Sequence, residues 1–328
     1  MHEPLTPIPL AEIEAARERI AGIARRTPLV PLGLPGESPR ILLKLENLQP
    51  IGSFKLRGAA NAMAVAGPDA LRDGVYTASA GNMAQGVAWS ARELGVRCRV
   101  IVPEGAPEAK TAAIERLGGE VIKVPFEAWW RAMQDHGYPG IDGLFIHPVA
   151  DPAVIAGNGT IGLEILEDAP DVDAIVVPFG GGGLSCGIAC AVRAVKPGVP
   201  VFAAEVETAA PFSASLAAGS ATSVDRVATF VDGIGGAAVL PEMWPLGRAV
   251  LAGSLVVSVA EIAAAIRLIV ERCRVVAEGA GAASVAAALA SIGAATDPLH
   301  GAKTIVCVVS GGNIDPAALA TILRGELP

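Results

Sequence analysis

The stretch of sequence that is most informative about the fold is Ile175-Val176-Val177-Pro178-Phe179-Gly180-Gly181-Gly182-Gly183. Its β-branched residues predict a buried strand, which ends at a proline and four consecutive glycines. The residues that follow, 185–195, have the apolar spacing of a helix. A strand that leads through a glycine loop into a helix is typical of α/β proteins, in which helices cover both faces of a parallel sheet.

The same alternation of strands and helices extends to both sides of this stretch. The predicted strands are 41–45, 75–78, 98–102, 120–124, 143–146, 174–177, 201–204 and 304–309, and the predicted helices are 10–23, 55–65, 83–94, 109–117, 159–166, 185–195 and 261–273. Ser258 and Glu261 form a capping box ahead of the last helix. We therefore predict two α/β units that pack closely and leave a cleft between them.

Composition favours a well-packed protein that acts on a small molecule. Of the 328 residues, 52% are hydrophobic and only 4% are aromatic, so the core is built from Ala, Val, Ile and Leu. The length is sufficient for two compact domains. The net charge is −8, and the 25 basic residues are scattered without runs, which argues against nucleic acid or an anionic membrane as a partner.

Several features predict a cytoplasmic protein. The N-terminal residues Met1-His2-Glu3-Pro4 lack the basic start and apolar core of a signal peptide. The longest uncharged stretch, Gly279 to Thr296, consists mostly of Ala, Gly and Ser and predicts a core helix rather than a membrane span. The 5 cysteines include no Cys-x-x-Cys pair, so neither a disulfide framework nor a zinc site is expected. Few residues follow Asn313, so no regulatory domain is expected at the C-terminus.

The four glycines form a candidate phosphate site. Gly180 to Gly183 lie between a strand and a helix, where backbone N–H groups converge at the positive end of the helix. A flexible turn is one alternative. A dinucleotide site is another, because Glu205 ends the next strand, but Ser185 or Cys186 then occupies the third glycine position of that motif.

Lys55 is the candidate catalytic residue. It lies in Ser53-Phe54-Lys55-Leu56-Arg57-Gly58, after the predicted strand 41–45 and a turn, at the start of the predicted helix 55–65. Partial burial and the neighbouring cation of Arg57 would both lower the pKa of its amine, as a Schiff-base lysine requires. A surface lysine at the start of a helix is the alternative.

Two further loops follow predicted strands at the edge where open α/β sheets bind ligands. Ser79-Ala80-Gly81-Asn82 precedes a helix, whose N-terminus could hold a carboxylate together with the Ser79 hydroxyl and the Asn82 amide. Asn82 could also bond a phenolic oxygen, and an ordinary helix cap is the alternative. Ser310, in Ser310-Gly311-Gly312-Asn313, could bond a ring nitrogen or cap a turn.

A phosphate site, a Schiff-base lysine and a carboxylate site together indicate pyridoxal 5'-phosphate with an amino-acid substrate. These motifs and Leu43-Lys44-Leu45-Glu46-Asn47-Leu48-Gln49-Pro50 resemble, in order and over nearly the whole chain, the serine/threonine dehydratase and serine racemase family. The resemblance implies the tryptophan-synthase-β fold (pyridoxal-phosphate fold type II): two open, twisted parallel-sheet α/β domains with the cofactor in the cleft between them. It implies a large cofactor-binding domain of residues 1–64 and 147–328 and a small domain of residues 65–146.

The resemblance also implies roles for particular residues. Lys55 would form the Schiff base and take the Cα proton of the substrate, and Phe54 would pack on the cofactor ring. Asn82 would bond the phenolic oxygen, Gly180 to Gly183 would hold the phosphate, and Ser310 would face the ring nitrogen. A neutral hydroxyl in that place favours elimination over transamination. The implied substrate-binding residues are Ser53, Ser79, Ala80, Gly81, Asn82 and Met83.

The implied activity is β-elimination from a 3-hydroxy amino acid of the threonine or serine class, giving a 2-oxo acid and ammonia, in a homodimer. Racemases carry a second serine where this chain has Ala80, so racemase activity is expected to be weak or absent. Family members that bind a divalent cation use a glutamate and a backbone carbonyl that correspond to Glu205 and Ala209, but Pro211 replaces the next acid. We therefore predict no metal, with Glu205 and Ala209 as the candidate ligands otherwise.

Three alternatives remain open at this point. Met83, Phe179 and the pair Trp129-Trp130 suggest an apolar substrate site, and hence a dehydratase for an aromatic 3-hydroxy amino acid such as phenylserine. The same residues could equally fill core or surface space. A β-replacement synthase is the second alternative, although Pro50-Ile51-Gly52-Ser53 differs from the Asn-containing sequence that such synthases place before the lysine. A dinucleotide-binding enzyme or an inactive binding protein is the third.

Overall fold

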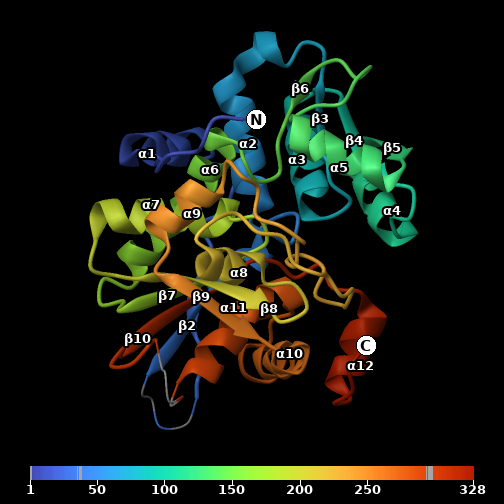
Figure 1. Cartoon of the computed structure of the whole chain (residues 1–328). Helices are drawn as coiled ribbons and strands as arrows, with labels where there is room; N and C mark the ends of the chain where they lie inside the picture. The colour runs from blue at the N-terminus through green and yellow to red at the C-terminus, as the bar shows by residue number, and fades with distance from the viewer. Residues whose placement is uncertain (1, 35, 37–38, 293, 295–297) are drawn as a thin grey trace.

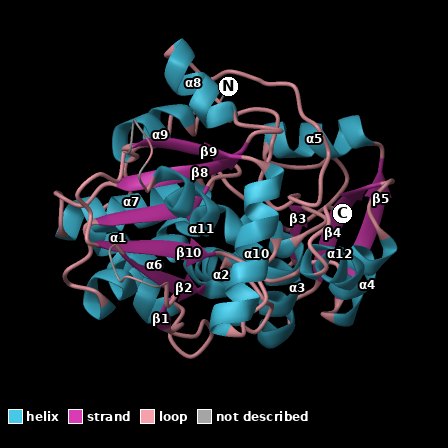
Figure 2. Ribbon diagram, turned by 90° about the horizontal axis from the view of Figure 1, so that it is seen from below, coloured by secondary structure: helices cyan, strands magenta, loops and turns pink. Residues whose placement is uncertain are grey.

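The computed structural model describes residues 2–34, 36, 39–292, 294 and 298–328. Within these residues the strands form two sheets, one of six strands and one of four. Figure 1 shows the smaller sheet with its helices at the upper right, beside the larger sheet, and Figure 2 shows the same arrangement from below. The predicted α/β fold with two sheets is confirmed.

The larger sheet has the strand order β1-β2-β10-β7-β8-β9. Its strands are β1 Leu29–Pro31, β2 Arg40–Leu45, β7 Ala174–Pro178, β8 Val201–Val206, β9 Gly253–Val257 and β10 Thr304–Val309. Neighbouring strands are parallel, except that β1 pairs with β2 in the antiparallel direction. Because parallel strands present their carboxyl ends at one edge, the loops after β2, β7 and β10 lie at the same edge of the sheet.

The smaller sheet has the order β5-β4-β3-β6 and is entirely parallel. Its strands are β3 Val75–Ala78, β4 Cys98–Pro103, β5 Gly119–Val124 and β6 Leu144–Phe145, and the helices between them are α3 Asn82–Leu94, α4 Glu108–Arg116 and α5 Phe126–Asp135. The predicted strands and helices between residues 75 and 124 are confirmed to within one residue at each end.

Helices cover both faces of the larger sheet. The remaining helices are α1 Leu10–Arg19, α2 Lys55–Ala70, α6 Pro152–Asp168, α7 Gly183–Val195, α8 Pro211–Ala218, α9 Trp244–Val250, α10 Val259–Cys273, α11 Gly279–Ser291 and α12 Pro316–Leu323, with the 3-10 helix η1 Glu46–Leu48. Alternate residues of a strand point to opposite faces. Accordingly, Ile175 and Val177 join a core with α6 and α7, whereas Val176 joins a second core with α10 and α11.

Some elements differ from the predictions. Helix α1 ends at Arg19 rather than at residue 23, α6 begins well before residue 159, and β1, β9, α5, α8, α9 and α12 were not predicted. The uncharged stretch forms the buried helix α11, and its last predicted residue, Thr296, lies outside the described residues. The domain boundaries stay a prediction, and the four strands of the smaller sheet all lie between residues 75 and 145.

In the described part of the chain, no helix combines the length and the apolar character that a membrane crossing requires.

Candidate active site

Lys55 begins helix α2, and the segment before it is fixed against the end of β10. The N–H of Phe54 donates to the carbonyl oxygen of Ser310 at 3.0 Å, and the N–H of Gly312 donates to the carbonyl oxygen of Gly52 at 2.9 Å. Gly52 has a φ of 74°, a left-handed conformation that favours glycine. These backbone contacts bring the loop after β10 next to Lys55.

The Lys55 amine is held by a single carbonyl group and has a lowered pKa. Its Nζ donates to the carbonyl oxygen of Pro148 at 2.8 Å and lies 5.1 Å from the centre of the Phe54 ring. Burial lowers the pKa of Lys55 to about 8, and the negative charge of Glu278 opposes this effect. Near neutral pH a larger fraction of this amine is therefore unprotonated than of an ordinary lysine, as a nucleophile or base requires.

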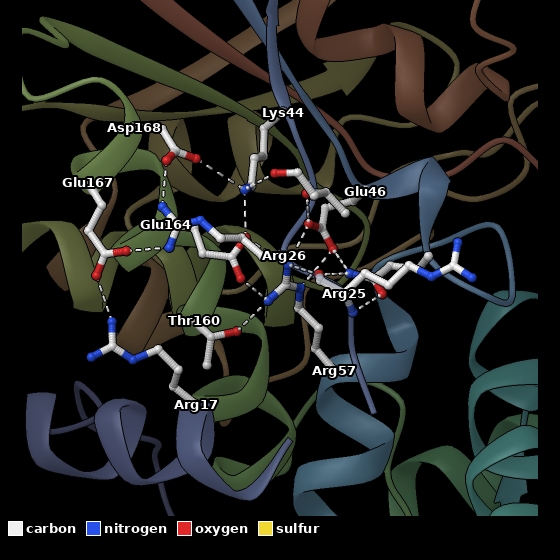
Figure 3. Close-up of polar contacts among 12 residues, drawn as sticks. Arg17, Arg25, Arg26, Lys44, Glu46, Arg57, Thr160, Glu164, Glu167 and Asp168 are labelled. Carbon is white, nitrogen blue, oxygen red and sulfur yellow. Dashed lines mark hydrogen bonds and ion pairs between the residues drawn. The ribbon is translucent and has the colours of Figure 1, made fainter. Parts of the chain in front are cut away.

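Arg57 does not lower the pKa of Lys55, so this part of the prediction is wrong. The Arg57 guanidinium donates to Glu46 at 2.8 Å and to Glu164 at 2.6 Å within a buried ionic cluster (Figure 3). Burial would lower the pKa of Arg57, but the two carboxylates raise it above its ordinary value. Because these carboxylates balance its charge, Arg57 stabilises the start of α2 instead of acting on the amine.

The loop between β6 and α6 connects Lys55 with the four glycines. Pro148 accepts the hydrogen bond from Lys55, and the next residue, Val149, lies against the glycines. A Cβ atom at Gly181 would come within 2.7 Å of a Val149 methyl group, and one at Gly183 within 3.0 Å of the Val149 carbonyl oxygen. Side chains at these positions would therefore displace the loop that holds the amine.

The glycines also expose backbone donors at the start of α7. This helix begins at Gly183, and the N–H groups of a first helical turn have no partner inside the helix. A phosphate group fits such a place, because it accepts several hydrogen bonds and carries negative charge. A dinucleotide fits less well, because Ser185 stands where the third glycine is needed and its Oγ bonds the carbonyl oxygen of Gly182 at 3.3 Å.

Asn82 connects α3 of the smaller unit with the loop after β10. Its Nδ2 donates to Oε1 of Glu278 at 2.8 Å, and its Oδ1 accepts from Nδ2 of Asn313 at 2.7 Å. The N–H of Asn313 in turn donates to Oε2 of Glu278 at 3.1 Å. Among the described residues no side chain caps α3, so the ordinary helix cap considered as an alternative for Asn82 is wrong. The loops at residues 79–82 and 310–313 therefore meet beside Lys55.

Glu278, His147 and Pro148 were not identified from the sequence. Burial and the nearby charge of Asp232 raise the pKa of Glu278 to about 7, while the hydrogen bond from Asn82 opposes this shift. Glu278 stands directly before a helix of small residues, and His147 and Pro148 lie in the loop that follows β6. The signal for His147 and Pro148 is their place after a strand, where open α/β sheets bind ligands.

The other predicted site residues lie around this centre. Ser53 is completely buried, and its Oγ has no hydrogen-bond partner among the described residues. The Ser79 Oγ accepts from the N–H of Gly81 at 3.2 Å. Ser310 is 3% exposed, and Ala80 packs at the edge of the core of the smaller sheet.

The residues that suggested an aromatic substrate lie in the cores. Met83 is buried in the core of the smaller sheet, and Phe179 stacks on Phe212 with ring centres 4.6 Å apart. Trp129 and Trp130 are half-buried on α5 and pack against core residues. Met83 and Phe179 therefore fill space inside the protein, as the alternative interpretation predicted.

The candidate metal ligands are used for other contacts. The Glu205 carboxylate accepts from the N–H groups of Phe212 and Ser213, each at 2.8 Å, and from Oγ of Ser254 at 2.6 Å. Ala209 lies just before α8, whose first turn supplies these two N–H groups. Over the ranges that the structure describes, no three His, Cys, Asp or Glu side chains form a group that could hold a metal ion.

These residues fit the cofactor that the resemblance implies. The Lys55 amine has a lowered pKa, and the loop that holds it also supports a glycine cradle at a helix N-terminus. An aldehyde that carries a phosphate group and a polar ring could use all of these features.

Comparisons with known proteins show the family to which the chain belongs. The sequence pattern of the family described as pyridoxal-phosphate-dependent enzymes matches residues 20–311. The chain is 42% identical over 330 residues to the L-threonine ammonia-lyase of Geobacter sulfurreducens, across 98% of this chain and 79% of that protein. It is 36% identical to the catabolic L-threonine dehydratase of Escherichia coli (strain K12), across 96% of both. Maize serine racemase, a solved structure, superposes with a TM-score of 0.87 at 30% identity, across 98% of both chains.

Proposed function

This chain belongs to the family of pyridoxal-phosphate-dependent enzymes, and we propose that it converts a small 3-hydroxy amino acid of the threonine or serine class into a 2-oxo acid and ammonia by β-elimination. The observation that carries the proposal is the Lys55 amine, whose pKa is lowered and which Pro148 holds next to the glycine loop. The names of the relatives, a threonine ammonia-lyase and a threonine dehydratase, support the choice of substrate class.

We assign the cofactor contacts as follows. Lys55 is the attachment point, and the backbone N–H groups of Gly180 to Gly183 bind the phosphate at the start of α7. Phe54 flanks the ring, and Ser310 faces the ring nitrogen with a neutral hydroxyl. Asn82 faces the phenolic oxygen, and its amide is already oriented by hydrogen bonds with Glu278 and Asn313.

Lys55 is also the base of the reaction. When bound, pyridoxal phosphate supplies an electron sink for the electron pair that remains at Cα after a proton is lost. The Lys55 amine takes that proton, because its pKa of about 8 keeps part of it unprotonated near neutral pH. In the hydrogen bond to Pro148 the amine is the donor, so its lone pair stays available.

The surroundings of the site favour a small substrate. The N-terminus of α3 and the Ser79 hydroxyl are positioned to bind the substrate carboxylate. Met83 and Phe179 pack in the cores, so these two side chains give no support to an aromatic substrate. Ala80 carries no hydroxyl that could act as a second proton donor, which argues against racemisation. Phenylserine is kept as a test substrate.

We further propose that the protein is a cytoplasmic homodimer. The cysteines, none of which forms a disulfide in the described residues, support the location, and the family resemblance supports the assembly.

The proposal is tested by labelling and by turnover. The purified protein is expected to be yellow, to lose its visible band on treatment with borohydride, and to carry the reduced adduct on Lys55 in peptide mapping. Ammonia release is then measured with threonine, serine and phenylserine in parallel, and we expect threonine or serine to be the best substrate. An adduct on another residue, or no turnover of any of the three, would contradict the proposal.

Substitution of Gly181 by alanine is expected to weaken cofactor binding by about tenfold, because overpacking against Val149 costs about 1 to 3 kcal/mol. The measurement is the loss of visible absorbance after dilution of the holoenzyme. Val149→Ala in the same chain removes the two clashing methyl groups and should restore part of the affinity. Gly198→Ala is the matched control, because no described atom lies within 4 Å of its Cβ position. Equal losses of cofactor affinity in Gly181→Ala and Gly198→Ala would contradict the proposed role of the 147–150 loop.

A further inference from the structure

The loop of residues 147–150 positions two parts of the site at once. The carbonyl oxygen of Pro148 accepts the hydrogen bond from the Lys55 amine at 2.8 Å. The next residue, Val149, lies against the glycine loop of Gly180 to Gly183. A shift of the 147–150 loop would therefore move the acceptor of the amine and the support of the phosphate site together.

The ring of His147 holds this loop in place. Its Nδ1 accepts hydrogen bonds from the N–H of Val149 at 3.0 Å and from the N–H of Ala150 at 2.7 Å. A ring nitrogen that accepts two N–H groups carries no proton, so the proton of the neutral ring lies on Nε2. Nε2 is 3.1 Å from the carbonyl oxygen of Met133 on α5 and donates to it. These contacts determine both the orientation and the tautomer of the ring.

The surroundings of His147 keep the ring neutral. It is 2% exposed, and its ring centre lies 4.2 Å from that of His136, which in turn stacks on His2 at 3.8 Å. The charged or titratable groups that face it are His136, His2 and Lys55, and Glu242 lies 3.2 Å from Nε2 of His136 on the outer side. Burial and then the charge of His136 lower the pKa of His147 to about 3.

The backbone of His136 is also unusual. Its φ of 53° places it in the left-handed region, which among the described non-glycine residues is shared only with Arg274. A non-glycine residue adopts this conformation at an energetic cost, and such residues are frequent around functional sites. At the end of α5, this conformation sets the His136 ring against the ring of His147.

We propose that His147 is a positioning residue of the reaction. Through Nδ1 it fixes the 147–150 loop, so that the Pro148 carbonyl sets the place of the Lys55 amine and Val149 sets the place of the glycine loop. This inference rests on the proposed role of Lys55 and adds a residue that acts through the backbone of the 147–150 loop. Its effect is large because a displacement of about 1 Å at a reacting group can reduce the rate by about a hundredfold.

Three substitutions separate the functions of the ring. In His147→Asn, the side-chain oxygen is as many bonds from Cα as Nδ1, and asparagine readily accepts from N–H groups two and three residues ahead. In His147→Gln, the amide nitrogen is as many bonds from Cα as Nε2 and can still donate to Met133, but the amide oxygen is one bond farther from Cα than Nδ1. His147→Phe keeps the aromatic bulk and loses both polar contacts. If the ring acts by packing, His147→Phe should keep the wild-type activity. If it acts through Nδ1, His147→Asn should keep it.

We expect the Asn variant to keep the wild-type kcat and the wild-type rate of cofactor release from the holoenzyme within about threefold. The Gln and Phe variants should lose at least about tenfold in kcat, with a smaller change in KM, and should release the cofactor at least about tenfold faster. Hydrogen exchange provides a readout that does not depend on activity. The N–H groups of Val149 and Ala150 should stay protected in the wild type and in the Asn variant, and should exchange faster in the other two.

The inference is overturned if the variants rank in the opposite order in kcat and in the rate of cofactor release. If His147→Phe behaves as the wild type, or if His147→Asn is as impaired as His147→Phe, the role of Nδ1 is wrong. If the Phe variant does not fold, as judged by circular dichroism, the comparison of Asn with Gln decides between the two nitrogens in the same way.

Borohydride labelling separates this inference from the proposed function. If the reduced adduct in the wild type lies on a residue other than Lys55, the proposed function fails and the inference fails with it. If the adduct lies on Lys55 and all three variants release the cofactor at the wild-type rate, only the positioning role of His147 is wrong.

Discussion

Lys55→Ala is expected to reduce ammonia release from 3-hydroxy amino acids by at least about a thousandfold, because it removes the attachment point of the cofactor and the base together. The variant should still fold, because the described hydrogen bond that it loses is a single one, from the amine to the carbonyl oxygen of Pro148. Turnover is measured with saturating cofactor. Borohydride reduction followed by peptide mapping should find no adduct at position 55.

Lys123→Ala is the matched control for this experiment. Lys123 is an exposed lysine on β5, an edge strand of the smaller sheet, so its loss should leave turnover unchanged. If Lys55→Ala keeps more than about a tenth of the wild-type kcat, Lys55 is not the base, because loss of a general base reduces a rate by about a hundredfold or more. A nicotinamide-dependent enzyme would keep its activity in Lys55→Ala, because its reaction does not use this lysine.

The largest loss of stability is expected from Arg57→Met. Arg57 and Lys44 lie with Glu46 and Glu164 in a buried cluster, in which each of these side chains is at most 7% exposed (Figure 3). The cluster joins β2, η1, α2 and α6. Removal of the arginine leaves two buried carboxylates with one cation, and such a change costs about 3 to 5 kcal/mol in the free energy of unfolding.

Denaturant unfolding measures this loss, with Arg40→Met as the control. Arg40 pairs with Asp171 at 2.7 Å, but the two side chains are 49% and 62% exposed, so this surface pair contributes less than about 1 kcal/mol. Equal losses in the two variants would show that the buried cluster is not special. The pKa of Glu46 provides a second readout, because burial would raise it and Arg57 holds it below its ordinary value. The pKa of Glu46 should therefore rise in Arg57→Met.

The cluster gives a physical meaning to the motifs on which the family resemblance was based. Lys44 and Glu46 belong to the first motif and Arg57 to the second, yet none of them is placed to touch a ligand. Lys44 donates to Glu164 at 2.6 Å and to the carbonyl oxygen of Thr27 at 2.7 Å. Together these residues hold the first turn of α2, and with it Lys55, against α6.

The sequence by itself determined the fold class, the family resemblance, the enzyme class and the cofactor, and these predictions are confirmed. The reason is that they rest on local properties. Strand and helix periodicity is visible within about ten residues. The glycine loop, the Lys55 motif and the Ser79-Ala80-Gly81-Asn82 loop each carry their chemistry within a few consecutive positions.

Only the tertiary structure decided which side chains act on one another. Lys55 bonds a carbonyl group 93 positions away, and Asn82 bonds Glu278 across 196 positions. For the same reason the pairing of Arg57 with Glu164, 107 positions away, could not be read from its closeness to Lys55 in sequence. The pKa of a buried group depends on the charges and the burial that the folded chain places around it, and local sequence contains neither.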